Sequence, residues 1–223
     1  NEKINHLRNL MKEKNIDYYL IPHDDENLLE SIPVNKERLK WISGFSGSAG
    51  SLIVGKNNLN LFVDGRYLVQ SKMEMKKVKC TIHNISDFSL LDFIKQIKLL
   101  DCKIGIDIKT ISINNYNLLK KICHEKNIKI VNIINNLIDI LWKRSLKFQK
   151  TDELFLLDKK YVGKSFFEKK KQLISYIKGQ GAQLIFTQNS ESLAWLLNLR
   201  GKDLDFTPIT FCSALISKSF IYL

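Results

Sequence analysis

The stretch WISGFSGSAGSLIVGKNNLNLFVDGRYLVQ, residues 41–70, decides the fold of this chain. It contains two apolar runs, 51–54 and 59–63, joined by Gly-Lys-Asn-Asn, and this pattern predicts a β-hairpin. An Asp-Gly-Arg turn follows the second run, and Asp64 is suited to cap the helix that Arg66 opens. The segment before the hairpin, NKERLKWIS, predicts a helix that Asn35 caps.

Three evenly spaced glycines, Gly44, Gly47 and Gly50, invite comparison with known glycine-rich sites. A P-loop needs GxxxxGK[ST], a dinucleotide fingerprint needs GxGxxG between a strand and a helix, and a nucleophile elbow needs GxSxG. The stretch satisfies none of these patterns. The glycines are therefore interpreted as architecture that allows positive φ angles and close backbone packing. Arg66 beside them offers a planar fork of donors for a carboxylate or a peptide carbonyl.

Strand and helix patterns alternate on both sides of this stretch. Apolar residues at helical spacing predict helices over 4–11, 66–75, 87–100 and 112–126. Short apolar runs predict strands over 17–23, 78–83, 103–107 and 128–133. The alternation favours an α/β fold in which helices flank a mixed or parallel sheet.

A second unit is expected after Trp142. Residues 143–163 lose clear periodicity and are basic, which predicts a linker. The pattern then restarts with helices over 165–178 and 190–200, the latter capped by Ser190, and strands over 182–188, 207–216 and 217–223. We expect one domain over 1–142 and the start of a truncated second domain over 164–223, because the chain stops within an apolar strand. No internal repeat is evident in the sequence.

Composition indicates a globular protein with a sizeable core, since 44% of the 223 residues are hydrophobic. The formal charge of +12 is mostly lysine scattered along the chain, which favours a solvated basic surface and leaves an anionic partner as the alternative. The four cysteines form no CxxC pair and lie in apolar segments, so we expect small buried side chains in a reducing compartment. No apolar run approaches the ~20 residues of a membrane span, and residues 1–14 do not resemble a signal peptide. Because the chain does not begin with Met, a removed leader remains an open alternative.

The sequence does not predict a metal site. His6, His23, His83 and His124 share no spacing typical of metal ligands. The acidic run that follows His23, residues 24–26, is read as a solvated loop, with a cation site as the alternative.

Together the segments ISGFSGSAGSLIV (42–54) and LFVDGRYLVQ (61–70) resemble the creatinase-type N-terminal domain of the aminopeptidase P family, the Xaa-Pro aminopeptidases, particularly their three-domain cytosolic form. The segment ESLAWLLNLRGKDLDFTPITF (191–211) is similar to part of the middle domain of the same enzymes. The resemblance extends from YYLIPHDDENLLE to the end of the chain. It implies a ribonuclease-H-like mixed sheet with flanking helices, followed by an incomplete second domain of similar type.

The resemblance also implies a function. The parent protein would release the N-terminal residue from peptides with proline in second position, and two manganese ions in a C-terminal pita-bread domain, absent here, would activate the water. This fragment alone would be inactive and hold no metal. Arg66 matches a substrate-binding residue. The remaining matches are structural or interdomain: Gly44, Gly47, Gly50, Asp64, Gly65, Trp195, Asn198, Arg200 and Gly201.

The expected partners are Xaa-Pro peptides, the chain's own catalytic domain and a second copy in a homodimer, without a membrane and with nucleic acid disfavoured. The expected location is cytoplasmic, with a vacuolar compartment left open. A noncatalytic creatinase-fold module that binds proteins or nucleic acid is the alternative function.

Overall fold

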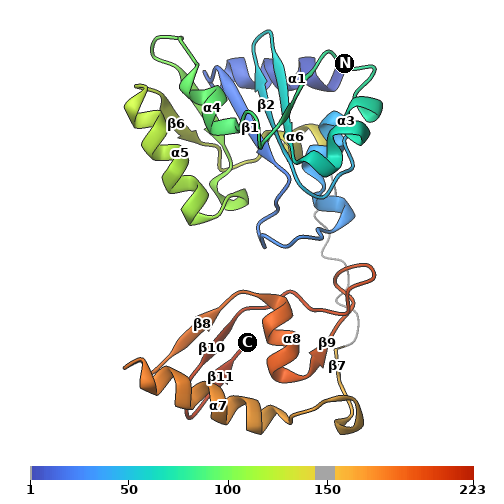
Figure 1. Ribbon diagram of the computed structural model, residues 1–223, viewed down its shortest axis with the longest axis vertical. Coiled ribbons are helices and arrows are strands. Elements are labelled where there is room, and N and C mark those ends of the chain that lie inside the picture. Colours follow the sequence, from blue (N-terminus) through green and yellow to red (C-terminus); the bar gives the residue numbers. More distant parts are fainter. Residues whose placement is uncertain (1, 144–153) are drawn as a thin grey trace. The chain divides into compact units, whose positions relative to one another are not determined.

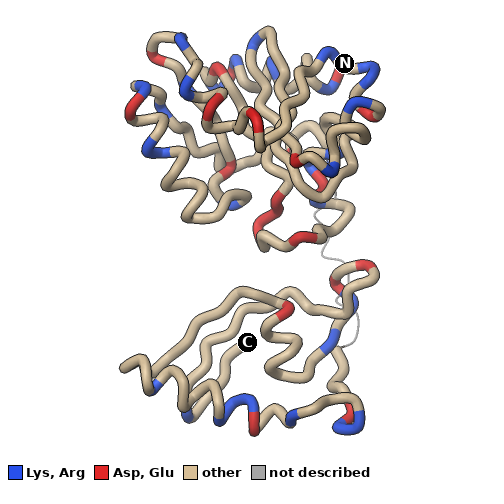
Figure 2. The backbone as a smooth tube through the Cα atoms, viewed as in Figure 1, with Lys and Arg blue, Asp and Glu red and all other residues tan. Residues whose placement is uncertain are grey.

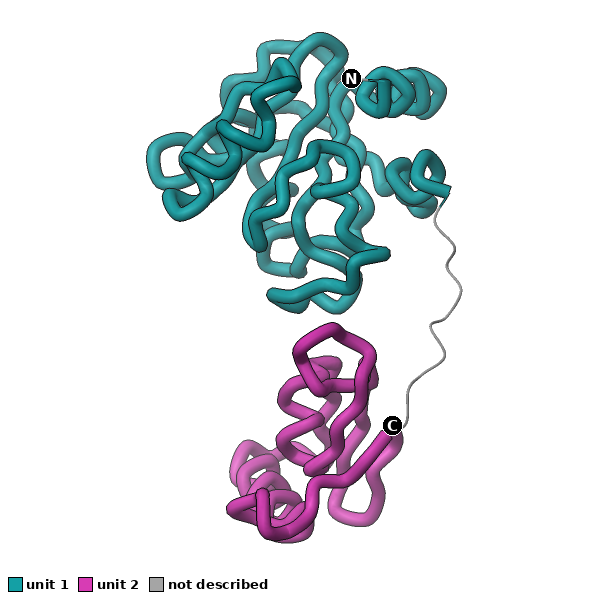
Figure 3. Tube along the Cα trace, turned by 90° about the vertical axis from the view of Figure 1, so that its right-hand side faces the viewer, with its two compact units in different colours: residues 1–145 teal, residues 146–223 magenta. Residues whose placement is uncertain are grey.

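The structure, a computed structural model, describes residues 2–143 and 154–223. The chain divides into two compact units, residues 1–145 and 146–223 (Figure 3). Lys and Arg occur on helices and loops of both units (Figure 2). Within the described residues, no helix has the length and hydropathy needed to cross a bilayer.

Unit 1 is built on a six-stranded mixed sheet with the order β4-β3-β2-β1-β5-β6 (Figure 1). Its strands are β1 (Tyr18–Pro22), β2 (Ser51–Gly55), β3 (Leu59–Val63), β4 (Thr81–Asn84), β5 (Lys103–Ile106) and β6 (Lys129–Asn132). Strand β2 runs antiparallel to both of its neighbours, β1 and β3, whereas the pairs β3–β4, β1–β5 and β5–β6 are parallel. The predicted hairpin is confirmed as β2 and β3, paired with Ile53 opposite Asn60.

Among the described residues, six α-helices flank this sheet: α1 (Glu2–Glu13), α2 (Arg38–Ser43), α3 (Leu68–Glu74), α4 (Leu90–Lys95), α5 (Ile113–Glu125) and α6 (Leu137–Trp142). Successive strand residues point to opposite faces. Leu52 therefore packs in a core with α1, α2 and α6, whereas Ile53 packs in a second core with α4 and α5. The predicted α/β class with helices on a mixed sheet is confirmed.

Two details of unit 1 differ from the expectations. Asn35 does not cap α2: it lies in a 3-10 turn, Val34–Lys36, and Glu37 occupies the cap position. The extra turn arises because Pro33 fixes the backbone just before it. Helix α6 was not predicted, because its short apolar segment follows an asparagine-rich stretch with little periodicity.

Unit 2 contains a three-stranded antiparallel sheet, β11-β10-β8, and a two-stranded ribbon, β7-β9. Its elements are β7 (Phe155–Leu156), α7 (Phe166–Gly179), β8 (Ile185–Thr187), α8 (Ser190–Leu197), β9 (Leu199–Arg200), β10 (Ala214–Ile216) and β11 (Ile221–Tyr222). The N-cap of α8 is Asn189, whose side chain accepts a 2.6 Å hydrogen bond from the amide of Ser192. The expected cap, Ser190, is instead the first helical residue.

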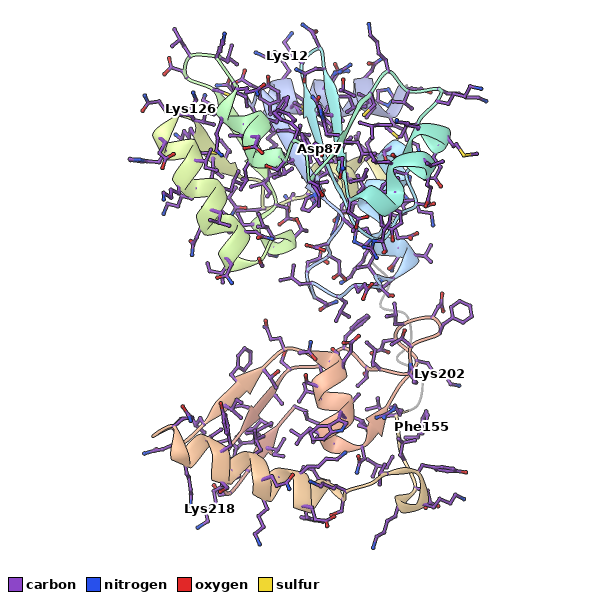
Figure 4. The ribbon with its side chains drawn as sticks, viewed as in Figure 1. Lys12, Asp87, Lys126, Phe155, Lys202 and Lys218 are labelled. Carbon is purple, nitrogen blue, oxygen red and sulfur yellow. The ribbon has the colours of Figure 1, made fainter. Side chains whose placement is uncertain are left out.

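The expected linker, residues 143–163, is not irregular throughout. Strand β7, which carries Phe155 (Figure 4), pairs with β9, and a 3-10 turn follows at Lys159–Tyr161. Part of the stretch thus belongs to unit 2. Residues 144–153 lie outside the described residues, and the domain boundaries stay a prediction.

All four cysteines are free, as their sequence context indicated. Cys102 and Cys123 are buried, and Cys80 and Cys212 are half-buried. Burial raises the pKa of the Cys102 and Cys123 thiols to about 11, so both remain protonated and unreactive near neutral pH.

The structure also reveals an internal repeat that the sequence did not make evident. In each unit a helix leads into a strand, a second helix and then an antiparallel strand pair. Lys3 Nζ donates to the carbonyl of Trp41 at 2.8 Å and lies 4.2 Å from the centre of its ring. Lys169 Nζ makes the same two contacts with Trp195, at 2.6 and 4.4 Å.

Candidate functional site

Arg66 lies on an exposed turn between β3 and α3. The turn is a 3-10 helix, Gly65–Tyr67, capped by Asp64, whose Oδ1 accepts a 2.9 Å hydrogen bond from the Arg66 amide. The predicted capping role of Asp64 is thereby confirmed. The Arg66 side chain is 70% exposed, and its Nη2 donates to Asp64 Oδ2 at 2.7 Å.

Arg66 and Asp64 each stabilise the charged form of the other. The hydrogen bond from Arg66 lowers the pKa of Asp64, and the Asp64 carboxylate raises the pKa of Arg66. Asp64 uses only one side of the guanidinium, since Nε and Nη2 donate to it. Within the described residues Nη1 has no hydrogen-bond partner, so this side of the fork can bind a carbonyl or carboxylate oxygen.

The glycine-rich loop supports the turn through its contacts with Tyr67. The Tyr67 hydroxyl lies 2.6 Å from Ser48 Oγ, and its ring packs edge-on against Phe45 with centres 5.8 Å apart. A Cβ on Gly47 would lie 2.3 Å from Phe45 Cζ and 2.8 Å from Tyr67 Cδ1. Only glycine fits here, because the loop passes directly against the rings that hold the turn.

A second set of contacts joins the loop to α3. Glu74 accepts hydrogen bonds from the Ser46 amide at 2.9 Å and from Ser46 Oγ at 2.5 Å, and Gln70 donates to both side chains. Burial opposes ionisation of Glu74, but these bonds outweigh it and lower its pKa. Sequence reasoning missed these three residues, because nothing local pairs Ser46 with a helix that follows the hairpin.

The other glycines have separate roles. Gly44 ends α2 with φ of +85°, a conformation that favours glycine. A Cβ on Gly50 would lie 3.0 Å from the carbonyl oxygen of Phe62, so the loop can lie close to β3 only with glycine there. Gly65 has open space around its Cα and is not sterically required.

The matched residues of unit 2 hold the end of α8. Asn198 takes a left-handed conformation there, and its Oδ1 accepts a 2.5 Å hydrogen bond from Lys169. Arg200 Nη1 donates to the carbonyls of Ala194 and Leu199 at 2.7 and 2.8 Å. A Cβ on Gly201 would lie 2.9 Å from Thr210 Cβ. These contacts support the structural role expected for this set.

The acidic run after His23 is only partly solvated, because the side chains of Asp24 and Glu26 are 44% and 30% exposed. Asp25 is fully buried, and Lys36 Nζ lies 3.3 Å from its Oδ2 and 3.1 Å from Glu26 Oε2. The expectation of a solvated loop was wrong for Asp25, which pairs with Lys36 from later in the same loop. Within the described residues, no three His, Cys, Asp or Glu side chains gather in a way that could hold a metal ion.

Buried Arg38 links this loop to α6 through hydrogen bonds to carboxylates on both. Its Nε and Nη2 donate to the two oxygens of Asp139 at 2.8 and 2.9 Å, and Nη2 also donates to Glu26. Burial opposes ionisation of Glu26, but the hydrogen bond and charge of Arg38 outweigh it and lower its pKa to about 2. The loop before α2 is therefore held by charge pairs as well as by apolar packing.

Comparison with known families accounts for this arrangement. A family model described as "Creatinase/Prolidase N-terminal domain" matches residues 3–139, and a second model with the same description matches residues 147–223. The chain belongs to the creatinase/prolidase N-terminal domain family. The two matches agree with the repeated pattern of contacts in units 1 and 2.

Relatives of this creatinase-type chain include proteins named as peptidases. It is 33% identical over 222 residues to "Probable Xaa-Pro aminopeptidase P" of Coprinopsis cinerea, covering 97% of this chain. It is 33% identical over 220 residues to "Xaa-Pro aminopeptidase 1" of Dictyostelium discoideum, covering 93% of this chain. The chain spans only 35% of the length of each relative.

A solved structure supports the creatinase-type fold. The X-prolyl aminopeptidase of Caenorhabditis elegans, described as a cytosolic enzyme with a di-nuclear active site, superimposes with a TM-score of 0.89. The match covers 99% of this chain and 38% of that one at 22% identity.

Proposed function

We propose that this chain is the N-terminal portion of a metal-dependent Xaa-Pro aminopeptidase, which releases the N-terminal residue from peptides with proline in second position. The observation that carries the proposal is the exposed guanidinium of Arg66, held on a braced turn in a chain whose relatives are named for this activity. In this proposal Arg66 lies at the edge of the substrate cleft and donates a hydrogen bond to the bound peptide.

The metal centre of the proposed enzyme lies outside residues 1–223. The description of the Caenorhabditis elegans enzyme as di-nuclear supports a two-metal centre, and we propose manganese as the metal. A pair of such ions would supply an activated water for attack on the scissile carbonyl. The contribution of this chain is to orient the peptide through Arg66 and to position that residue through Asp64, Tyr67 and the glycine-rich loop.

We further propose that the full-length protein is cytoplasmic and forms a homodimer. The cytosolic description of the Caenorhabditis elegans enzyme supports the location, and no comparison supports a vacuolar one.

The test is a hydrolysis assay on the full-length protein. Purified protein is stripped with a chelator, reloaded with Mn²⁺ and given a tripeptide with proline in second position, with the same peptide carrying alanine there as the control. We expect release of the first residue from the proline peptide only, lost on chelation and restored by Mn²⁺. If the first residue is not released from the proline peptide either with or without Mn²⁺, the result would contradict the proposal and favour a noncatalytic creatinase-fold module.

A further inference from the structure

Helix α6 completes unit 1 by packing against α1 and α2. Leu137 and Ile138 of α6 are fully buried in the core that those helices share. The ring of Trp142 stacks on Trp41 with centres 5.6 Å apart and planes 20° apart. Asp139 pairs with Arg38 on the same face of α2. Helix α6 therefore covers a face of the α1 and α2 pair that would otherwise be exposed.

Unit 2 repeats the first two helices of this arrangement. The shared contacts of Lys3 with Trp41 and of Lys169 with Trp195 make α7 the counterpart of α1 and α8 the counterpart of α2. Both second helices end in a left-handed residue, Gly44 in α2 and Asn198 in α8. The faces that α1 and α2 present to α6 therefore have equivalents on α7 and α8.

At the equivalent place unit 2 has an open, largely apolar groove of about 850 Å³ between α7, α8 and β8. The residues that line it include Leu173 and Tyr176 of α7, Ser192 and Trp195 of α8, and Ile185 of β8. Tyr176 is 66% and Trp195 59% exposed, and both line the groove together with the core residues Leu193 and Leu196. Within the described residues, no aromatic ring stacks on Trp195.

The groove residues correspond to those that α6 contacts in unit 1. Trp195 is the counterpart of Trp41, and Ser192 precedes Trp195 by the same spacing as Arg38 precedes Trp41. Arg38 and Trp41 are the side chains that meet Asp139 and Trp142 of α6. The groove thus has the place and the apolar character of a helix-binding site, with serine where unit 1 has arginine.

We propose that this groove is the docking site of an amphipathic helix from the same polypeptide, located beyond Leu223 in the full-length protein. The helix packs on α7 and α8 as α6 packs on α1 and α2. It presents a large apolar side chain to Trp195, and it needs no carboxylate opposite Ser192 because the arginine is absent. Two observations favour a source in the same chain: α6 is itself part of the chain whose groove it fills, and the relatives extend well beyond the 35% of their length that this chain spans.

The test compares two cysteine variants in the chain of residues 1–223 and in the full-length protein. Ser192→Cys places a thiol in the groove, and Ser175→Cys places one on the exposed side of α7, outside the groove lining. The rate of alkylation by iodoacetamide is measured for each cysteine by mass spectrometry of its peptide, so the native thiols do not interfere. Both changes are small and lie at exposed positions, which keeps the fold intact.

In residues 1–223 we expect both cysteines to react at similar rates. In the full-length protein we expect Cys at position 192 to react at least about 10-fold more slowly, because alkylation then requires local opening of the docked helix, while Cys at position 175 is unchanged. A photo-crosslinker attached at position 192, in a mixture of ¹⁴N- and ¹⁵N-labelled protein, should capture a peptide from beyond Leu223 of the same copy.

Equal reaction rates at position 192 in the two proteins would overturn the proposal. So would protection that appears only as the concentration of residues 1–223 rises, or crosslinks between labelled and unlabelled copies, since either result would assign the groove to a second copy. The readouts are independent of peptidase activity, so the proposed function and the docking site fail separately.

Discussion

At the scale of single residues, Arg66 combines an exposed side chain with a backbone that is held in place. Its backbone is held by the Asp64 cap, and its neighbour Tyr67 is held by Ser48 and Phe45. An exposed arginine usually has several accessible rotamers, and fixing it before binding reduces the entropy lost when it meets a ligand. In the proposed function, the glycine-rich loop therefore contributes through the turn that it supports.

The first prediction concerns Gly47. Gly47→Ala should destabilise unit 1 by about 1–3 kcal/mol, because the new methyl group overlaps the rings of Phe45 and Tyr67. Gly65→Ala is the matched control: its Cβ meets open space, so we expect a change within about 0.5 kcal/mol or a slight gain. Urea unfolding, monitored by hydrogen exchange of the amides in β2 and β3, measures the free energy of unfolding of both variants. Equal stability of the two variants would show that the loop does not pack on the turn as described.

At the scale of elements, the loop before α2 and helix α6 are joined by the charges around Arg38. Glu26 has its pKa lowered to about 2 in the folded state from an ordinary value of 4.5. A lowered pKa means that the carboxylate stabilises the fold above pH 4.5 and that this contribution is lost as the pH falls toward 2.

The second prediction follows from this sign. The free energy of unfolding of unit 1 should fall between about pH 4.5 and pH 2, and Glu26→Gln should make that fall shallower because one linked proton is removed. Glu30→Gln is the control, since Glu30 is exposed and forms no hydrogen bond or ion pair within the described residues. Urea titrations at several pH values measure the slopes. Identical slopes for wild type and Glu26→Gln would contradict the ion pair.

The elements that sequence reasoning recovered are those whose signals are local. Asp64 and the Gly-Lys-Asn-Asn turn each act on residues next to them, so the cap and the hairpin were predictable. Glu37 replaced Asn35 as a cap because the preceding proline inserts a 3-10 turn, which no local preference of asparagine reveals. The ribbon of β7 and β9 joins residues far apart in sequence and has too few residues for a periodic pattern.

The candidate site was predictable to the same extent. Arg66 and its cap follow from adjacent residues, whereas the bond between Ser46 and Glu74 depends on α3 folding back on the loop. The internal repeat escaped notice because its defining contacts, such as Lys169 with Trp195, pair residues on different helices.

At the scale of the whole molecule, the chain is two related units joined by a segment with many basic residues. The third prediction is that limited trypsin digestion cuts first within 143–153, since domain boundaries carry few contacts. Cleavage after Lys159 or Lys160 should be slower, because the 3-10 turn and the β7–β9 pairing hold that stretch. An earliest cut after Lys159, or after Lys56 in the turn between β2 and β3, would count against the two-unit division.

The fourth prediction separates this chain from the proposed metal centre. Titration of residues 1–223 with Mn²⁺ by calorimetry should show no stoichiometric site in the micromolar range, and the chain alone should release nothing from Xaa-Pro peptides. The full-length protein, under the same conditions, is the positive control. A tight site in residues 1–223 would place metal chemistry in this chain and refute the proposed division of labour.

The most direct test of the central claim is the kinetics of Arg66→Ala in the full-length protein. If Arg66 donates a charge-assisted hydrogen bond to the bound peptide, kcat/KM for Xaa-Pro peptides should fall roughly 10 to 100-fold, and Arg66→Lys should recover only part of it because the planar fork is lost. Lys72→Ala, an exposed cation on α3, should leave kcat/KM unchanged. The melting temperature should be nearly constant in all three variants. Wild-type kcat/KM in a folded Arg66→Ala protein would contradict the account.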